Sequence, residues 1–570
     1  MTKIIGLNSY HPDSSACLLV DGKLMSFIEE ERLTRIKHWA GFPKYSIEYC
    51  LNSANLKIED IDYFTINSNP RNFISKKILF TILNPNLNFL SERIRSYFDK
   101  SQKREINKKL FYAQKIDHHV SHIASSVYFS NFDDSSFISI DGFGDFTSCC
   151  WGIFSKQKIN ILGRVFFPHS LGIFYHGLTQ FMGFYNYGDE YKVMGLSAYG
   201  RNEFQNQLKN LINFDESYIY KLNLDYFDFY KKGIYRNKNG ESIYKDLFNH
   251  KLSSLLNIEK NKDTKDIHEK YINLSNSAQF IFEDIYFKLI RFVQKKTNLK
   301  RLVLSGGCSM NSLANGKIQE NSDFEEVYIP PWPGDAGGAI GSAIYKYHEL
   351  NNFSKKNINR IVSPYLGPSY SDEEIKKILT NYARQINFNY YNDDILIDKV
   401  TASLTEQKII GWFQGKMECG ARALGNRSII ADPRSNLIKD LINSKIKLRE
   451  MFRPFAPSIL REHVSDWFEN DIDVPYMSKV FKIKNEKKEL VPAITHRDGT
   501  GRLQTVKRDD NIKYYNLINS FYKKTNVPLL LNTSLNENEP IVCNPNEAIN
   551  LFLRTDMDLI VIENFYITKK

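Results

Sequence analysis

Residues 3–30 read KIIGLNSYHPDSSACLLVDGKLMSFIEE. An apolar strand leads into a polar turn, and two more apolar strands follow, joined at Asp21-Gly22, a dipeptide typical of tight hairpins. Residues 137–165, FISIDGFGDFTSCCWGIFSKQKINILGRV, repeat this order of strand, turn, acid, small hydroxyl residues, cysteine and hairpin. DSSAC (13–17) and DFTSC (145–149) hold equivalent places. This weak repeat favours two related lobes, each with a small-residue turn at the same point of its sheet. Two unrelated hairpins are the alternative.

Paired lobes of this kind resemble the actin, hexokinase and Hsp70 group, in which backbone amides of the two turns hold a nucleotide's phosphates. Downstream, the apolar spacing of residues 278–293 predicts a long helix, and RLVLS (301–305) predicts a buried strand. Gly306-Gly307 follows that strand, and a second glycine-rich turn, PGDAGG (333–338), opens another predicted helix. Glycines there let backbone approach a ligand closely, so these turns favour a nucleotide cleft.

Length and composition indicate a multidomain globular protein. The 570 residues exceed what one hydrophobic core supports, and 42% hydrophobic with 25% charged residues is ordinary. The N-terminus has no secretory pattern and no apolar run suits a membrane span, so we expect a cytoplasmic protein without membrane contact. Seven scattered cysteines suggest reduced thiols. The net charge of +11 is widely spread, so nucleic acid is not an expected partner.

A polar segment near residue 350 divides the chain. We predict a first domain at 1–355 and a second α/β domain at 363–570. Residues 201–265 are rich in Lys, Asn, Tyr and Phe with poor periodicity, which indicates an insertion. This insertion either shapes an acceptor pocket or forms a solvated surface.

Three histidines cluster in IDHHVSHIASSVYF (116–129). On a helix, His118 and His122 share one face while His119 points elsewhere. A solvated or core helix face is the alternative to a metal site for this pair. With Asp141 and Asp335, which lie at a strand end and in a glycine turn, the set suits Fe(II), Mn(II) or Zn(II). His11, in the first hairpin turn, is either a general base, a substrate ligand or a structural turn residue.

The second domain concentrates basic side chains among glycines and apolar residues. Guanidinium groups bind phosphate through two hydrogen bonds and lysines act as point charges. Asn532 and Ser534 follow a buried strand, where strands commonly end at a ligand. Surface ion pairing is the alternative, but the setting favours a phosphate-rich substrate. The basic residues are Arg422, Arg427, Arg434, Lys447, Arg449, Arg453, Arg497 and Arg502.

Blocks along nearly the whole chain resemble the O-carbamoyltransferase family, which includes nodulation protein U and the tobramycin, cephamycin and novobiocin carbamoyltransferases. The first-domain blocks are HPDSSACLLVDGKLMSFIEEERLTRIKHWAGFP, DHHVSHIASS, SIDGFGDFTS, SLGIFYHGLTQFMGF, EYKVMGLSAYG, LSGGCSMN and PGDAGGAIGSA. The second-domain blocks are GKMECGARALGNRSIIADPR, KLREMFRPFAPS, ITHRDGTGRLQTV and LLNTSLNENEPIV.

The resemblance implies an α/β fold with two parts. The first is a two-lobed, actin-like (ASKHA) domain related to the tRNA threonylcarbamoyl-transfer protein, and the second is a YrdC-like domain. It also implies that the second domain makes carbamoyl-adenylate from carbamoyl phosphate and Mg-ATP. The first domain then transfers the carbamoyl group to a hydroxyl of a small-molecule or sugar acceptor, in natural-product or glycan biosynthesis, at an iron site. A homodimer is a further expectation.

Residue by residue, the resemblance places the metal at His118, His122, Asp141 and Asp335. It places nucleotide binding at Gly142, Gly144, Gly306, Gly307 and Asn311, and an acceptor-side catalytic histidine at His11. Carbamoyl phosphate and ATP fall to Arg422, Lys447, Arg449, Arg453, Arg497, Asn532 and Ser534, with Lys447 and Arg449 catalytic.

The chain departs from the family pattern at two positions. Tyr10 stands where the family often has glycine, and Ala421 stands where it often has proline. Tyr10 therefore puts the shape of the acceptor pocket in question. A tRNA threonylcarbamoyl-type modification enzyme and a non-catalytic nucleotide-binding scaffold are the competing hypotheses. The dense RALGNRS and REMFRPFAPS blocks argue against the first, and the complete metal set argues against the second.

Overall fold

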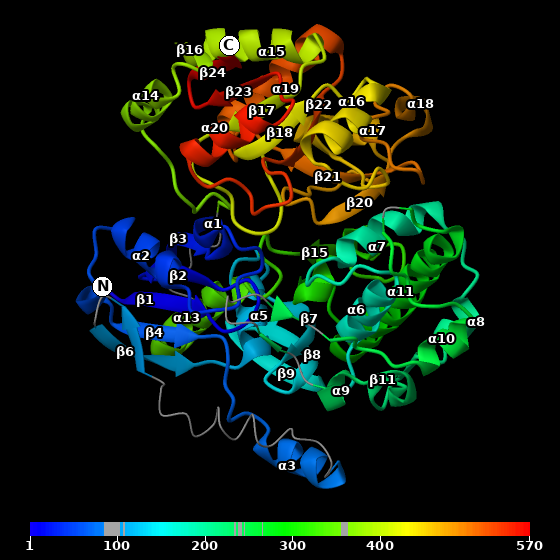
Figure 1. Ribbon diagram of the computed structural model, residues 1–570. Helices are drawn as coiled ribbons and strands as arrows, with labels where there is room; N and C mark the ends of the chain where they lie inside the picture. The colour runs from blue at the N-terminus through cyan, green and yellow to red at the C-terminus, as the bar shows by residue number, and fades with distance from the viewer. Residues whose placement is uncertain are drawn as a thin grey trace. The chain divides into compact units, whose positions relative to one another are not determined.

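The computed structural model describes residues 1–84, 103–106, 109–232, 235–236, 242–243, 245–264, 266–354 and 363–570. The chain forms two compact units, coloured blue to green and green to red in Figure 1. The first comprises Met1–Asn311 and Ile318–Val362, and the second comprises Ser312–Lys317 and Ser363–Lys570. The short segment Ser312–Lys317 therefore packs with the second unit, which the sequence did not predict. Both units are α/β, as expected.

The first sheet of the first unit has the order β3-β2-β1-β4-β6-β5. Strands β1, β2 and β3 form an antiparallel meander, whereas β4 and β6 continue the sheet parallel to β1. The predicted hairpin at Asp21-Gly22 is confirmed, and both residues have the positive φ that tight hairpin turns need. The strands are β1 Lys3–Asn8, β2 Ser15–Val20, β3 Lys23–Glu29, β4 Tyr63–Ile66, β5 Lys103–Ile106 and β6 Lys109–Lys115.

The second sheet repeats this arrangement with the order β9-β8-β7-β14-β15. Strands β7, β8 and β9 are again an antiparallel meander, and β14 and β15 continue it parallel to β7. The paired residues Asn8 and Ser15 flank the first turn, and Gly144 and Thr147 flank the second. The internal repeat is thus confirmed as two lobes of one topology. The strands are β7 Ser135–Gly144, β8 Thr147–Ser155, β9 Lys158–Phe166, β14 Arg301–Ser305 and β15 Glu326–Tyr328.

Two helices bring functional residues to the ends of these strands. Helix α5, His118–Val127, begins where β6 ends, and the side chain of Asp117 caps it by accepting a hydrogen bond from the Val120 N–H at 2.9 Å. Helix α13, Gly337–Leu350, packs against α5. The two backbones are so close that a Cβ on Gly341 would lie 1.7 Å from the Ser121 carbonyl oxygen. The starts of both helices are therefore held in a fixed relation.

Among the remaining helices of the first unit, the longest packs against β7 and β8. The predicted long helix is α11, and its apolar stripe, including Ile281, Ile285 and Leu289, is buried. The predicted insertion contains the small hairpin of β10 and β11, and several of its residues between 233 and 265 lie outside the described part of the chain. The bounds are α1 Glu31–Thr34, α2 Lys44–Asn52, α3 Ile74–Leu83, α6 Leu171–Phe181, α7 Glu190–Leu196, α8 Gln205–Leu208, β10 Ile212–Asp215, β11 Ile219–Leu222, α9 Phe229–Lys232, β12 Tyr235–Arg236, β13 Ser242–Ile243, α10 Lys251–Leu256 and α11 Glu269–Thr297.

The second unit is built on one mixed nine-stranded sheet, with the order β16-β24-β23-β17-β18-β22-β19-β21-β20. Its helices bury a continuous apolar core against this sheet. The strands are β16 Ile386–Tyr390, β17 Ile410–Phe413, β18 Arg427–Ala431, β19 Ala456–Leu460, β20 Lys479–Lys482, β21 Thr500–Val506, β22 Leu529–Ser534, β23 Leu559–Ile562 and β24 Phe565–Lys569. The helices are α12 Ser312–Gly316, α14 Asp372–Asn381, α15 Asp393–Thr405, α16 Asn436–Leu441, η5 Ile442–Ile446, α17 Val464–Trp467, α18 Asn485–Lys488, α19 Ile512–Thr525 and α20 Pro545–Arg554.

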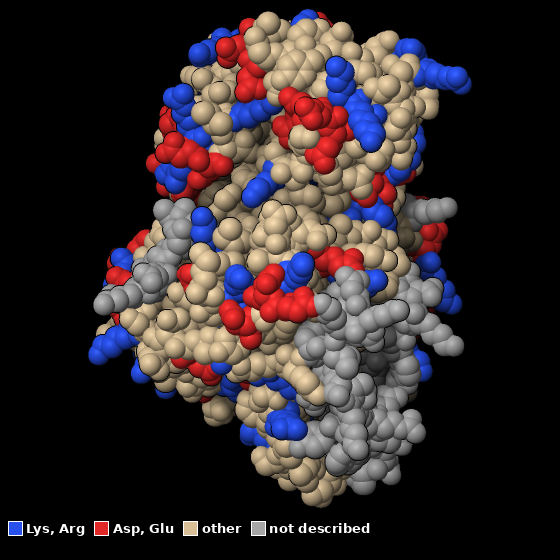
Figure 2. All heavy atoms as spheres, turned by 90° about the vertical axis from the view of Figure 1, so that its left-hand side faces the viewer, with Lys and Arg blue, Asp and Glu red and all other residues tan. Residues whose placement is uncertain are grey.

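The surface and the cysteines add two general observations. On the face seen in Figure 2, basic and acidic side chains are interspersed among uncharged residues, so the excess positive charge is not collected there. All seven cysteines are free thiols, and six of them are buried. Among the described residues, no helix is both long and apolar enough to cross a bilayer.

Candidate functional site

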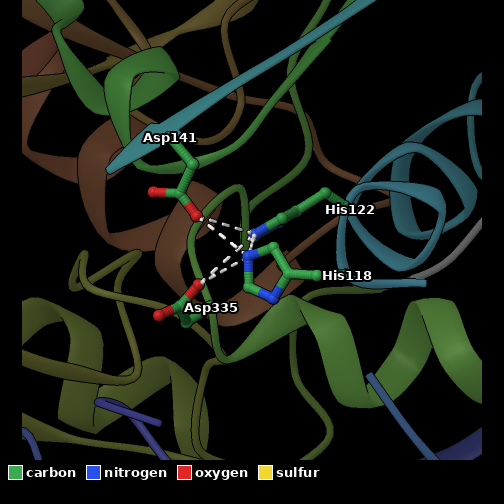
Figure 3. A group of neighbouring side chains, drawn as sticks. All are labelled: His118, His122, Asp141 and Asp335. Carbon is green, nitrogen blue, oxygen red and sulfur yellow. Dashed lines mark hydrogen bonds and ion pairs between the residues drawn. The ribbon is translucent and has the colours of Figure 1, made fainter. Parts of the chain in front are cut away.

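Four side chains of the first unit converge on one point (Figure 3). His118 and His122 extend from the first turns of α5, Asp141 comes from β7, and Asp335 lies just before α13. Both histidines are fully buried and both carboxylates are largely buried. The structure therefore brings together all four residues that the sequence predicted as metal ligands.

The distances are those of a coordination shell. The Nε2 atoms of His118 and His122 are 3.1 Å apart, and each lies 3.1 Å from Oδ2 of Asp141. Oδ1 of Asp335 lies 3.5 Å from the His118 nitrogen and 3.3 Å from the His122 nitrogen. Ligands about 2.1 Å from one ion stand about 3.0 Å apart at right angles and about 3.4 Å apart in a tetrahedron. The donor set fits a divalent transition metal or zinc.

The electrostatics of the cluster follow from its burial. Burial disfavours a charged His122, but hydrogen bonds to Asp141 and Asp335 outweigh it and raise its pKa to about 9. Burial also raises the pKa of Asp335, and the nearby charge of Asp141 adds to this. Hydrogen bonds from both imidazoles overcome burial at Asp141 and hold its pKa well below the usual range. The two carboxylates and two imidazoles thus share protons through these hydrogen bonds. A bound cation would displace those protons.

The predicted nucleotide-binding glycines lie around the ligand Asp141. The Gly307 N–H donates to its Oδ1 at 3.3 Å, and Gly306 packs on the backbone of Ile140 with a φ of +84°. A Cβ on Gly144 would lie 1.9 Å from the His118 ring, whereas one on Gly142 would meet nothing within 4 Å. Gly144 and Gly307 are therefore tied to the metal ligands by contact. Their nucleotide role stays a prediction.

The side chain of Asn311 is engaged elsewhere. Its amide exchanges two hydrogen bonds with Gln279, of 3.0 Å and 3.1 Å, and Tyr175 also donates to Gln279. A nucleotide would have to bind beside this network or compete with it.

Three more residues lie near the candidate metal ligands: Asp145, which the sequence did not single out, and His11 and Tyr10, which it did. Oδ2 of Asp145, in the second turn, accepts hydrogen bonds from the backbone N–H groups of Asn69 and His118, at 2.7 Å and 2.9 Å. It therefore anchors the ligand helix, and only its place in the repeat could have signalled this. The ring of His11 lies 5.4 Å from that of His118, on the metal side. Tyr10 is 48% exposed with a φ of +61°, which explains why glycine suits this position.

His119 faces away from the ligands, as predicted, and its Nδ1 shares a hydrogen bond with Ser139 Oγ at 2.8 Å.

Four arginines of the second unit lie within electrostatic reach of one another, and one of them, Arg453, also pairs with Glu450 at 3.3 Å. Burial and the charges of Arg422, Arg449 and Arg453 hold the pKa of Arg502 well below its usual value. Among the described residues, its buried Nε has no hydrogen-bond acceptor. Like charges held together in this way create a strong local demand for an anion. Three of these residues were predicted for the substrate phosphates, and Arg502 was recognised only as one basic residue among several.

Lys447 and Asn532, which were predicted to bind the substrates, form hydrogen bonds within the protein. The Lys447 ammonium is buried and donates to the carbonyl oxygens of Ser534 and Asn536 and to the Asn536 side chain. The Asn532 amide donates to Ala423, Ser458 and Gln504. These contacts order the loop after β22 and the loop that carries Arg422. Arg497 is exposed, and its predicted role stays a prediction.

Two basic residues singled out by sequence are structural. Arg427 is fully buried and donates to four backbone carbonyls, including those of Gln414 and Pro368. Arg434 forms a double contact with Asp432. Glu418, which the sequence did not single out, accepts hydrogen bonds from the N–H groups of residues 424, 426 and 427. It therefore shapes the loop that follows Arg422.

The fold and the two clusters define a two-unit α/β protein with a candidate metal centre and a separate candidate anion pocket. Family models agree over most of the chain: residues 3–344 match the carbamoyltransferase N-terminus and residues 401–569 match the carbamoyltransferase C-terminus. The chain belongs to the carbamoyltransferase family, and it is a transferase enzyme.

Relatives of known sequence support this membership. Nodulation protein NolNO of Sinorhizobium fredii is 34% identical over 99% of this chain and 80% of its own length. Nodulation protein U of Rhizobium fredii is 35% identical over 42% of this chain and 38% of its own length. An uncharacterized protein of Synechocystis is 34% identical over the whole chain and 97% of its own length.

Solved structures resemble the chain only weakly. The activator of 2-hydroxyisocaproyl-CoA dehydratase from Clostridium difficile, with bound ADPNP, has a TM-score of 0.33 and 13% identity over 63% of this chain and 99% of its own. HypF of T. kodakarensis has a TM-score of 0.31 and 15% identity over 63% of this chain and 50% of its own. Scores this low do not define a fold, so the two-lobed description rests on the strand order.

Proposed function

We propose that the protein is an ATP-dependent O-carbamoyltransferase with two steps. In the first step, carbamoyl phosphate, ATP and water give carbamoyl-adenylate, phosphate and pyrophosphate in the second unit, which we take to be YrdC-like. In the second step, the first unit, which we take to be actin-like, transfers the carbamoyl group to an acceptor hydroxyl and releases AMP. The acceptor is a sugar or another small hydroxyl compound.

The arginine cluster is the single observation that carries this proposal. Carbamoyl phosphate and ATP are both polyanions, and four neighbouring guanidinium groups, one of which also pairs with Glu450, supply positive charge for them. Arg449 is held in place by its hydrogen bond to Asn443 at 2.7 Å and by its contact with the Phe455 ring, 4.7 Å away. Such groups act by orienting phosphates and by stabilising the charge that develops when pyrophosphate leaves.

The four-residue cluster of the first unit supports the transfer step. His118, His122, Asp141 and Asp335 would hold Fe(II), Mn(II) or Zn(II), and a bound ion would act as a Lewis acid on carbamoyl or hydroxyl oxygen. The chain's own residues fix this set: Gly307 holds Asp141, and Asp145 holds the start of α5. His11 lies beside the ligand His118, where it would contact the acceptor.

The test is pyrophosphate release from ATP, measured with and without carbamoyl phosphate. We expect release to require carbamoyl phosphate, to disappear in Arg449→Ala and to persist in His118→Ala. Arg384→Ala is the matched control, because Arg384 is exposed and lies in a different part of the unit's sequence. If the wild-type protein, supplied with Mg²⁺ and with Fe²⁺, Mn²⁺ or Zn²⁺, releases no pyrophosphate, the proposed function is wrong.

A further inference from the structure

A histidine–carboxylate pair lies on the same turn as His11 but outside the metal cluster. Asp13 ends that turn, and His38 follows the short helix α1. Both residues have positive φ, 57° for Asp13 and 53° for His38. This conformation costs a non-glycine residue roughly 1–2 kcal/mol, and such costs concentrate at functional sites. The positive φ angles of Asp13 and His38 therefore point to a functional role for the pair.

The pair has the geometry of a general base and its orienting acid. Nδ1 of His38 lies 2.6 Å from Oδ1 of Asp13, and the backbone N–H of His38 donates to Oε2 of Glu31 at 2.8 Å. Two contacts therefore fix the ring and its backbone. A proton shared between Nδ1 and Asp13 leaves the lone pair on Nε2, the tautomer that a general base requires.

The same three residues, Asp13, Glu31 and His38, also lie close enough together to be considered as a metal site. The separation of 2.6 Å argues against this reading. Two ligands of one ion stand about 3.0 Å apart or more, because each bond is about 2.1 Å long. The ligands at the metal cluster are 3.1 to 3.5 Å apart, so the two clusters differ in kind. Asp13 and His38 share a proton rather than a cation.

The other ring nitrogen of His38 faces the backbone of Gly188 from the opposite lobe. A Cβ on Gly188 would lie 2.7 Å from Nε2, and Gly188 has a φ of +82°. The Tyr187 ring meets the imidazole edge-on, with the centroids 5.1 Å apart. The His38 side chain is 29% exposed, and no described polar group contacts Nε2. The side chain thus remains partly exposed beside a position that only glycine can occupy without displacing the ring.

The pair lies close to the metal centre along the chain and in space. Asp13 is two residues from His11, whose ring is 5.4 Å from the metal-ligand candidate His118. From the other lobe, Glu190 is within electrostatic reach of His38, and Cys308 is within reach of both Glu190 and Asp141. Asp13 thus shares the turn of His11, beside the candidate metal ligand His118, and Glu190 of the other lobe adds negative charge near His38.

We propose that Asp13 and His38 form a general-base dyad that removes the proton of the acceptor hydroxyl during carbamoyl transfer. The inference rests on the proposed function. The O–H bond breaks and its proton moves to Nε2 of His38, while the oxygen bonds to the carbamoyl carbon. The bond from that carbon to the adenylate oxygen breaks and AMP leaves. The proton on Nε2 then passes to water, and Asp13 keeps the ring oriented throughout.

The charges around His38 set the direction of the pH dependence. Burial lowers the pKa of His38, but Asp13 and Glu31 outweigh burial and the repulsion from Lys37, so the pKa is raised. Glu190 faces it from the other lobe. Neutral His38 is the active form, so transfer rises with pH through a pKa above the ordinary 6.5. Removing the Asp13 charge moves that inflection to lower pH.

The experiment follows both steps in one reaction. Wild-type protein, His38→Gln and Asp13→Asn receive ATP and carbamoyl phosphate, with water or molar glycerol as the hydroxyl probe. Pyrophosphate reports activation, and AMP reports loss of the carbamoyl group from the adenylate. We expect His38→Gln to release pyrophosphate normally in the first turnover but to form AMP roughly 100-fold or more slowly. Asp13→Asn should be slower and should show the acid limb of its AMP rate at lower pH.

His268→Asn is the matched control, because His268 is exposed and Asn preserves its capping of α11. Absence of pyrophosphate in the wild type would refute the proposed function itself. Normal pyrophosphate with normal AMP formation in His38→Gln would refute only the dyad. If no hydroxyl probe consumes the adenylate, titration of the His38 imidazole by NMR decides: an unchanged pKa in Asp13→Asn overturns the inference, and a lowered one supports it.

Discussion

The metal cluster and the arginine cluster solve opposite electrostatic problems. The first mixes two imidazoles with two carboxylates, whose hydrogen bonds hold one another in place. The second gathers four guanidinium groups, and burial together with the charges of the other three lowers the pKa of Arg502. A self-balanced cluster can keep its geometry with or without its cation. The arginine cluster holds four basic side chains close together, with Glu450 paired to Arg453, so a bound anion should stabilise the second unit.

Removal of a metal ligand should have the largest effect. We expect His122→Ala to weaken binding of Zn²⁺ or Mn²⁺ by more than about 100-fold, since even outer partners of metal ligands contribute roughly 10–100-fold. Equilibrium dialysis with metal analysis measures this. His119→Gln is the matched control, because His119 lies on the same helix but bonds Ser139. Equal metal affinity in His122→Ala and wild type would show that the metal does not bind at this site.

A buried histidine beside the arginine cluster should make the second unit sensitive to acid. Burial, with the nearby charge of Arg502, lowers the pKa of His496 to about 4. A histidine with a depressed pKa stabilises the fold fully above its unfolded pKa, and this contribution is lost as pH falls from about 6.5 toward about 4. The loss should reach about 3 kcal/mol. Denaturant titrations across this pH range should show that the free energy of unfolding falls less in His496→Gln than in the wild type. An equal fall in both proteins would contradict the prediction.

Arg502→Ala should sharpen the comparison through ligand-dependent stability. Wild-type protein should gain thermal stability from pyrophosphate, by about 2.7 kcal/mol at 100 times the Kd. Most of this gain should disappear in Arg502→Ala, while the ligand-free variant should melt no lower, because the substitution relieves repulsion. Differential scanning fluorimetry with and without pyrophosphate measures both. Arg384→Ala should behave as wild type, and a full pyrophosphate gain in Arg502→Ala would exclude Arg502 from the pocket.

Two glycines offer the finest test of the metal cluster. Gly144→Ala should lower metal affinity by at least about tenfold, because its Cβ would displace the His118 ring. Gly142→Ala should leave affinity unchanged, since nothing lies within 4 Å of the added carbon. Calorimetric titration with Zn²⁺ compares the two. An equal effect of both substitutions would show that the turn, rather than the ring contact, governs the site.

Much of the first site could be predicted because its signals are local. The i, i+4 spacing of His118 and His122 on a helix follows from periodicity alone. Asp141 was expected at the end of its strand, whereas β7 continues to Gly144 and its pairing shifts register after Ile140. Asp145 was missed because its importance lies in contacts with backbone N–H groups 27 and 76 residues away. Composition carries no trace of such contacts.

The second site was less predictable because arginine has several tasks in proteins. Arg422, Arg427 and Arg434 are close in sequence, but only Arg422 joins the cluster, while the other two bind carbonyls and Asp432. Arg497 and Arg502 are also close, and strand alternation along β21 decides that Arg502 points to the cluster. Burial and register separate these roles, and neither follows from residue type.

The close contact of α13 with α5 has a consequence for the choice of metal. Because Gly341 brings α13 against the backbone of Ser121, the carboxylate before α13 and the imidazoles on α5 cannot move apart independently. A donor cage of fixed size selects ions by radius. Ca²⁺ needs six to eight oxygen ligands at about 2.3–2.6 Å, which this nitrogen-containing set of four does not offer. At the proposed metal site, the helix contact would thus favour small transition ions over the abundant larger cation.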